Sequence, residues 1–124
     1  MPSSTEPPSQ ITELPARVLS QCLAAGESLT LLDVREPNET AFCKIDVPAT
    51  ARLLSIPMRE VPSRLGEIDE ALGRGPLVVY CHHGVRSLAV AEWLCERQAG
   101  VISNLSGGID AWSVEVDPGV PRYR

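Results

Sequence analysis

Residues 77–87 read LVVYCHHGVRS, and this stretch decides the fold. Its first part, 77–80, is apolar and rich in β-branched side chains, which predicts a buried strand. From residue 85 to residue 98 the apolar residues recur at helical spacing, and Gly100 stands where a glycine commonly ends a helix. Cys81 therefore lies where a central strand passes directly into a helix.

Strand and helix patterns alternate on both sides of this stretch. Short apolar runs predict further strands at 29–34, 51–56 and 101–105. Helical spacing and capping residues predict helices at 13–25, 37–42, 61–72 and 109–114. Thr12 is expected to cap the first helix, with Pro15 in its first turn. The alternation predicts an α/β fold, a three-layer α/β/α domain with a mainly parallel sheet of about five strands.

The chain of 124 residues has the length of one domain. Residues 1–10 are rich in Pro and Ser and predict a disordered tail, so the domain is expected to span 11–124. The sequence shows neither a transmembrane stretch nor the apolar segment of a secretory signal, which favours the cytoplasm. The net charge is −5 and no basic stripe occurs, so neither nucleic acid nor an anionic membrane is an expected partner. We expect a monomer.

Cys81 has the setting of a reactive thiol. In open α/β sheets ligands bind beyond the carboxyl ends of the strands, and Cys81 lies at such an end. The backbone N–H groups of a strand-to-helix loop and the positive end of the following helix together bind anions. Gly84 allows the backbone to turn, and Arg86 adds a permanent positive charge. These features favour the thiolate, which is the nucleophilic form of cysteine.

Two interpretations remain open at some neighbouring positions. Arg86 is suited equally to bind an anionic substrate and to donate hydrogen bonds to loop carbonyls. Ser87 is suited either to donate to the thiolate or to lie at the helix start. His82 and His83 are expected to line the mouth of the pocket and to add partial positive charge. A metal site is not expected, because adjacent histidines rarely converge on one ion and the sequence offers no second Cys/His pair.

Asp33 and Arg35 follow the run that predicts the neighbouring strand, so they are candidates for the rim of the site. The interpretation that we favour is an internal salt bridge, formed by Arg35 with Asp33 or Glu39, which shapes that rim.

The other cysteines and the tryptophans are expected to be structural. The four cysteines include no Cys-x-x-Cys pair, so we expect free thiols and no disulfide. Cys22 and Cys95 fall on apolar helical faces and are expected in the core. For Cys43, an idle surface or half-buried thiol is favoured over a resolving thiol. Trp93 and Trp112 are expected to be packing residues.

Three segments of the chain resemble the signature segments of rhodanese-like domains. They are LLDVRE at 31–36, CHHGVRS at 81–87 and GGIDAW at 107–112. The combination in this order is specific, and the resemblance runs from about residue 11 to residue 124. It implies the rhodanese-like fold and a single-domain sulfurtransferase, with no cofactor.

The resemblance also implies a role for the loop. The active cysteine, Cys81, takes sulfane sulfur from a small anionic donor such as thiosulfate and holds it as a persulfide. It then passes this sulfur to a thiophilic acceptor such as cyanide, a small thiol or a protein. The implied binding residues are the loop positions His82, His83, Gly84, Val85, Arg86 and Ser87.

The spacing within the loop bears on the class of enzyme. Four residues lie between Cys81 and Arg86. Similar thiol phosphatases and arsenate reductases have one residue more, in a loop wide enough for a tetrahedral oxyanion. The shorter loop favours the sulfurtransferase. A sulfur carrier or regulatory module without turnover remains an alternative, and a phosphatase or arsenate reductase is less favoured.

Residues 43–50 depart from the family's pattern. The family usually carries a Gly-His-Ile-Pro-Gly-Ala-like segment here, whereas this chain has CKIDVPAT, without the glycines or the histidine. We therefore expect a different loop shape beside the site, and the preferred donor does not follow from the resemblance.

Overall fold

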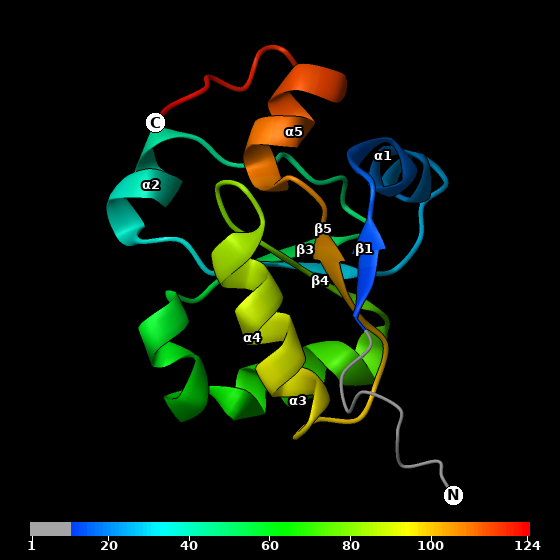
Figure 1. Ribbon diagram of the computed structural model, residues 1–124. Coiled ribbons are helices and arrows are strands. Elements are labelled where there is room, and N and C mark those ends of the chain that lie inside the picture. The colour runs from blue at the N-terminus through cyan, green and yellow to red at the C-terminus, as the bar shows by residue number, and fades with distance from the viewer. Residues whose placement is uncertain (1–10) are drawn as a thin grey trace, which may run out of the picture.

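The computed structural model describes residues 11–124, which contain a sheet of five parallel strands (Figure 1). The strands are β1 (Thr12–Leu14), β2 (Thr30–Asp33), β3 (Arg52–Ser55), β4 (Leu77–Tyr80) and β5 (Ile102–Leu105). Their order is β1-β5-β4-β2-β3, so β4 lies at the centre of the sheet. The predicted α/β fold with a parallel sheet of about five strands is confirmed. The tail predicted at 1–10 lies outside the described residues.

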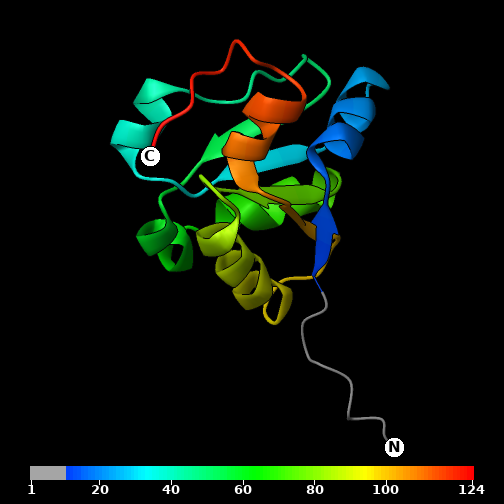
Figure 2. The same cartoon turned by 45° about the horizontal axis from the view of Figure 1, so that its top comes forward.

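Helices pack on both faces of the sheet and form the two outer layers. One face carries α1 (Ala16–Ala24) and α5 (Gly108–Glu115). The other face carries α3 (Leu65–Arg74), α4 (Val85–Cys95) and the 3₁₀ helix η2 (Met58–Ser63). The short helix α2 (Pro37–Phe42) follows β2, and the C-terminal segment runs beside it (Figures 1 and 2). Within residues 11–124, none of the helices combines the length and apolar character needed to cross a bilayer.

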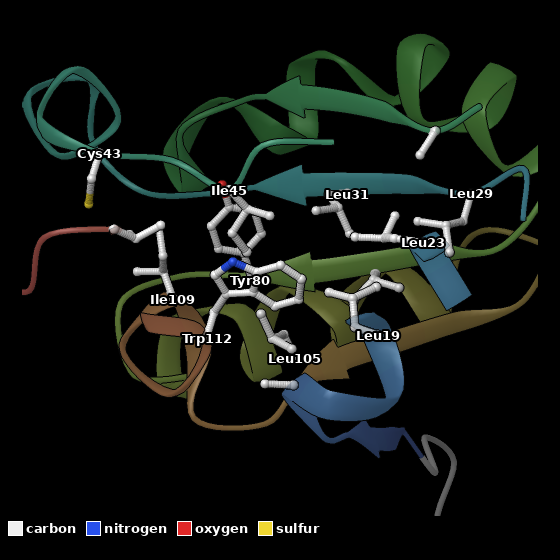
Figure 3. Packing of buried hydrophobic residues seen from close by; sticks show 14 residues of the cluster. Leu19, Leu23, Leu29, Leu31, Cys43, Ile45, Tyr80, Leu105, Ile109 and Trp112 are labelled. Atoms are coloured by element: carbon white, nitrogen blue, oxygen red, sulfur yellow. The ribbon is translucent and has the colours of Figure 1, made fainter. Parts of the chain in front are cut away.

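Strand β4 contributes to the core on both faces, because alternate side chains of a strand point in opposite directions. Val78 and Tyr80 pack with α1 and α5, whereas Leu77 and Val79 pack with α3 and α4. Figure 3 shows the first of these cores, where Trp112 of α5 approaches Tyr80. All residues of β4 are buried, as expected for a central parallel strand. The chain that follows β4 therefore leaves a well-fixed strand end.

The start of the first predicted helix is wrong. Residues 12–14 form strand β1, which pairs with β5, so Thr12 does not cap a helix. Helix α1 begins only after Pro15, because the proline ring disfavours a helical conformation in the residue before it. A strand of this length, largely exposed at the edge of the sheet, leaves little apolar periodicity in the sequence.

The helix predicted at 61–72 is divided into η2 and α3. Pro62 has no N–H to donate, so a continuous α-helix does not run through it. Helix α4 ends at Cys95, before the predicted end at Gln98. Cys95 is exposed, so its predicted place in the core is wrong, whereas Cys22 packs half-buried against the core.

Helix α5 begins next to the two residues that follow β4. The N–H groups of Ile109 and Asp110 donate to the carbonyl oxygens of Cys81 (2.9 Å) and His82 (3.0 Å). Gly108 precedes these two residues and has a left-handed backbone, with φ of 62°. A Cβ atom at Gly108 would clash with the same two carbonyl oxygens, so glycine alone permits this close contact.

We expect Gly108→Ala to lower the free energy of unfolding by more than about 2 kcal/mol, because both its backbone conformation and the two carbonyl groups oppose a side chain. Gly73→Ala is the matched control. Gly73 lies in α3 with open space around it, and alanine there should stabilise the protein by up to about 1 kcal/mol. Urea unfolding followed by circular dichroism measures both effects. A Gly108→Ala protein as stable as the parent would contradict the tight contact between α5 and the chain after β4.

Candidate active site

Cys81 lies directly after β4, and its side chain is almost fully enclosed, with 1% of the residue exposed. Its Sγ accepts hydrogen bonds from the backbone N–H groups of Gly84 (3.2 Å) and Ser87 (3.3 Å). Helix α4 starts at Val85, so its positive N-terminal end also faces the sulfur. These groups stabilise a negative charge on Cys81, as the sequence predicts for a thiolate.

Three carbonyl groups of the loop accept hydrogen bonds from groups other than the thiol. Those of Cys81 and His82 accept from α5, and that of Gly84 accepts from the side-chain amide of Asn104 (3.1 Å). Gly84 adopts a left-handed conformation, with φ of 95°, which reverses the chain just before α4. The sulfur thus faces the N–H groups of Gly84 and Ser87 while these three carbonyl oxygens are bound elsewhere, an arrangement that suits an anion.

Asn104 fixes the loop to strand β5, and sequence reasoning missed it. Its Oδ1 accepts from the hydroxyl of Ser87 (2.5 Å), while its amide nitrogen also donates to the carboxylate of Glu13 (both 3.1 Å). The hydroxyl of Ser87 therefore faces Asn104, and the backbone N–H of Ser87 is the group that donates to Sγ. The available signal was a polar residue within the apolar run at 101–105. The structure shows that this residue is buried.

Arg86 forms a bidentate ion pair with Glu39 of helix α2. The two guanidinium nitrogens Nη1 and Nη2 donate to the two carboxylate oxygens at 2.8 and 2.9 Å. The hydrogen bonds from Arg86 lower the pKa of Glu39 to about 2, although burial of the carboxylate opposes the shift. Glu39 is therefore ionised at neutral pH. The structure pairs Arg86 with a carboxylate, rather than with the loop carbonyls that the sequence offered as one alternative.

Asp33 and Arg35 form the predicted internal salt bridge. Arg35 Nε and Nη2 donate to the Asp33 carboxylate at 2.9 and 2.7 Å, and both side chains are fully buried. The remaining N–H groups of Arg35 donate to Glu39 O (3.3 Å), Tyr123 Oη (3.1 Å) and Cys43 O (2.7 Å). All five N–H groups of the guanidinium thus have acceptors, which a buried charge requires.

Tyr123 connects this buried pair to Arg86. Its hydroxyl accepts from Arg35 and donates to the Glu39 carboxylate (2.8 Å), which in turn binds Arg86. The chain of contacts therefore runs from Asp33 to Arg86 through residues far apart in the sequence. We call it the rim network: Asp33, Arg35, Tyr123, Glu39 and Arg86. Sequence reasoning missed Tyr123, since an aromatic residue near the C-terminus carries no recognisable signal.

The stretch at 43–50, which lacks the family's usual glycines and histidine, is anchored to the same network. Cys43 O accepts from Arg35, and Cys43 Sγ lies 3.8 Å from the guanidinium. Cys43 is buried, with 8% of the residue exposed, which is deeper than the surface or half-buried position predicted, and all four cysteines are free thiols. Ile45 is fully buried in the core beside α5.

The two histidines of the loop differ in exposure. His82 is buried and its ring stacks between those of His83 and Tyr123, with centroids 3.8 Å from each. Burial, with a further contribution from His83, lowers the pKa of His82, so this ring is neutral at pH 7. The predicted positive charge is therefore wrong for His82. His83 is exposed, with Nε2 3.9 Å from the carboxylate of Asp110.

The ligand atoms of His82, His83 and Asp110 lie within 4.8 Å of one another, but their arrangement does not fit a metal ion. A metal binds a lone pair in the plane of an imidazole ring. The two rings are stacked and inclined by only 25°, so their lone pairs do not converge on one point. The carboxylate of Asp110 also accepts two hydrogen bonds from Arg122, at 2.9 and 3.0 Å.

Comparison with known proteins agrees with this geometry. The family model described as Rhodanese-like domain matches residues 15–115. A sulfurtransferase from Allochromatium vinosum is 35% identical over 103 residues, which cover 83% of this chain and 89% of the relative. The putative sulfur carrier protein YrkF from Bacillus subtilis is 30% identical over 110 residues, which cover 89% of this chain and 55% of the relative.

Solved structures show the same fold. A rhodanese-related protein from Thermoplasma volcanium is similar with a TM-score of 0.70 and 30% identity, covering 90% of this chain and 99% of that protein. The resemblance carried by the segments at 31–36, 81–87 and 107–112 is thereby confirmed, and this chain belongs to the rhodanese-like domain family.

Proposed function

We propose that this protein is a sulfurtransferase that carries sulfane sulfur as a persulfide on Cys81. The observation that carries the proposal is the pair of backbone N–H groups, from Gly84 and Ser87, that donate to Cys81 Sγ at the start of α4. They stabilise the Cys81 thiolate in both steps: when it attacks the donor, and when it is regenerated as the acceptor takes the sulfur away. The sulfurtransferase relatives support the same type of reaction.

The transfer consists of two substitutions at sulfur. The Cys81 thiolate attacks the outer sulfur of thiosulfate or a similar donor, the S–S bond of the donor breaks, and sulfite or another anion leaves with the electron pair. A thiophilic acceptor, cyanide or a thiol, then attacks the outer sulfur of the persulfide. The S–S bond on Cys81 breaks, thiocyanate or an acceptor persulfide forms, and the thiolate of Cys81 returns.

The start of helix α4 offers further N–H donors for one extra sulfur atom. Val85 and Arg86 are the first residues of α4, and the first N–H groups of a helix have no partner within it. We propose that these N–H groups bind the outer sulfur of the persulfide, which carries the negative charge. We propose that His82 and His83 lie beside this position, while the rim network, including Asp33 and Arg35, holds Glu39 and Arg86 in place.

The remaining features of the proposal follow from the chain's chemistry. The cysteine and the loop N–H groups perform both steps, so we propose no cofactor. We propose a cytoplasmic monomer, in agreement with four free thiols, that receives sulfur from a small donor and passes it to a small thiophile or a protein thiol.

Incubation with sulfane donors should add one sulfur atom to the protein, and intact-mass spectrometry detects it. We expect the adduct with at least one of thiosulfate, an aromatic thiosulfonate and a low-molecular-weight persulfide, and we expect cyanide to remove it as thiocyanate. Cys81→Ser should lose the adduct entirely. Cys43→Ser is the matched control and should retain it, because Cys43 has no hydrogen bond from the loop N–H groups.

Absence of the adduct with every donor would overturn the proposal, as would an equal adduct in Cys81→Ser. The rate of thiocyanate formation separates an enzyme from a carrier of the kind that the relative YrkF is named for. A protein that loads sulfur stoichiometrically but turns over with cyanide no faster than free cysteine persulfide would be a carrier.

The same loop should not hydrolyse phosphate esters. Four residues separate Cys81 from Arg86, and Glu39 already binds the guanidinium that would otherwise bind a phosphoryl oxygen. With p-nitrophenyl phosphate, we expect release of nitrophenol at the rate of buffer alone. Hydrolysis that disappears in Cys81→Ser would instead favour the thiol-phosphatase alternative.

A further inference from the structure

We propose that Glu39 determines the donor specificity of this site: by binding Arg86, it favours organic sulfane donors with one negative charge over the thiosulfate dianion. The inference rests on the proposed sulfurtransferase function and names the class of donor for the same site. Thiosulfonates and persulfides of small thiols belong to this class of donor. In each of them the transferable outer sulfur is attached to an organic group.

Arg86 is already bound to a carboxylate. It is the cation of the loop itself, and a dianionic donor would need it to offset the charge of the Cys81 thiolate. Both of its terminal nitrogens already donate to Glu39, at 2.8 and 2.9 Å. A bidentate guanidinium–carboxylate pair is geometrically matched, so a donor anion competes with a strong partner.

Glu39 is also held in place by groups other than Arg86. Its Oε1 accepts from the backbone N–H of Glu36 (3.0 Å) in a capping box, and its Oε2 accepts from the hydroxyl of Tyr123 (2.8 Å). The side chain is only 14% exposed. Turning Glu39 away from Arg86 would therefore break several hydrogen bonds to an ionised, largely buried group, which is unfavourable.

The other arginines next to the loop are paired with carboxylates. Arg35 is paired with Asp33, Arg122 is paired with Asp110, and His82 is neutral at pH 7. Lys44, an exposed cation, lines a cleft beside α2 together with Asp46 and Asp117. The guanidinium groups that contact the rim network or α5 are thus each balanced by a carboxylate. Repulsion between the thiolate and a donor grows with donor charge, so a dianion is opposed about twice as strongly as a monoanion.

Exposed apolar side chains in the loop and at the end of α2 suit an organic group. Val85, in the loop, is 77% exposed, and Phe42, at the end of α2, is 54% exposed. Phe42 contacts the ring of Tyr123 edge to face, with centroids 5.6 Å apart, and Tyr123 stacks on His82 of the loop. An organic donor gains contact with such side chains, whereas thiosulfate does not.

The test compares how fast Cys81 is loaded by thiosulfate and by benzenethiosulfonate, using rapid quenching and intact mass. Glu39→Gln keeps an acceptor for the N–H of Glu36 but removes the charge that binds Arg86. We expect kcat/KM for thiosulfate to rise about tenfold and that for benzenethiosulfonate about threefold, because the effect of removing one charge scales with donor charge. The preference should therefore shift toward thiosulfate.

Glu67→Gln is the matched control. Glu67 also accepts two hydrogen bonds from one arginine, Arg64, at 2.7 and 2.9 Å, but both side chains lie on the surface outside the rim network. This variant changes the net charge of the protein by the same amount. Its ratio of the two kcat/KM values should equal that of the parent, which would exclude an effect of overall charge.

Tyr123→Phe provides a second variant that leaves the net charge unchanged. It removes the hydroxyl that donates to Glu39 but retains the ring that stacks on His82. The ratio should shift toward thiosulfate, by less than in Glu39→Gln. If the parent loads sulfur and neither variant changes the ratio, the inference is overturned while the proposed function stands. If the parent loads sulfur from neither these donors nor a low-molecular-weight persulfide, the proposed function fails, and the inference fails with it.

Discussion

Two backbone hydrogen bonds determine the character of the site: those from the first turn of α5 to the carbonyl oxygens of Cys81 and His82. The C=O and N–H of a trans peptide point in opposite directions, so fixing these two carbonyls outward turns the N–H groups of His82 and His83 the other way, just before the N–H groups of Gly84 and Ser87 that donate to the sulfur. Without these bonds, the loop could present oxygen atoms to the sulfur, and a thiolate would be destabilised. The central position of β4 and the glycine at 108 both serve this contact, because they bring α5 close behind the strand end.

Around these two backbone hydrogen bonds, side chains from distant segments of the chain arrange the charges. The rim network joins the end of β2, helix α2, the loop and the C-terminal segment, and it alternates acidic and basic groups through one tyrosine hydroxyl. Its innermost member, Arg35, is a buried cation whose five donors are all satisfied. In the mechanism proposed above, different parts of the molecule therefore supply reactivity and charge selection: peptide groups activate the sulfur, and the rim network sets the electrostatic field beside the loop.

The sequence predicted most of the sheet and the position of Cys81, because buried parallel strands and a strand-to-helix cysteine leave strong local patterns. It failed at β1 and around Pro62, where a short edge strand and a proline leave weak or misleading periodicity. It anticipated the Asp33–Arg35 pair, since the two residues are close in sequence. It did not anticipate Asn104, Tyr123 or the pairing of Arg86 with Glu39, because these contacts join separate segments and depend on three-dimensional packing. The neutral His82 likewise follows from burial, which a single sequence does not reveal.

The inward N–H groups of the loop have an evolutionary consequence. Because they belong to the main chain, substitutions other than proline at His83 or Val85 leave them in place, so drift at these positions preserves the hydrogen-bond donors around the sulfur. Mutational sensitivity is concentrated instead at the points that fix the backbone: the two glycines at 84 and 108, and Asn104. Such an arrangement lets descendants of this chain vary the identity of their substrates through the surrounding residues while the same nucleophile persists.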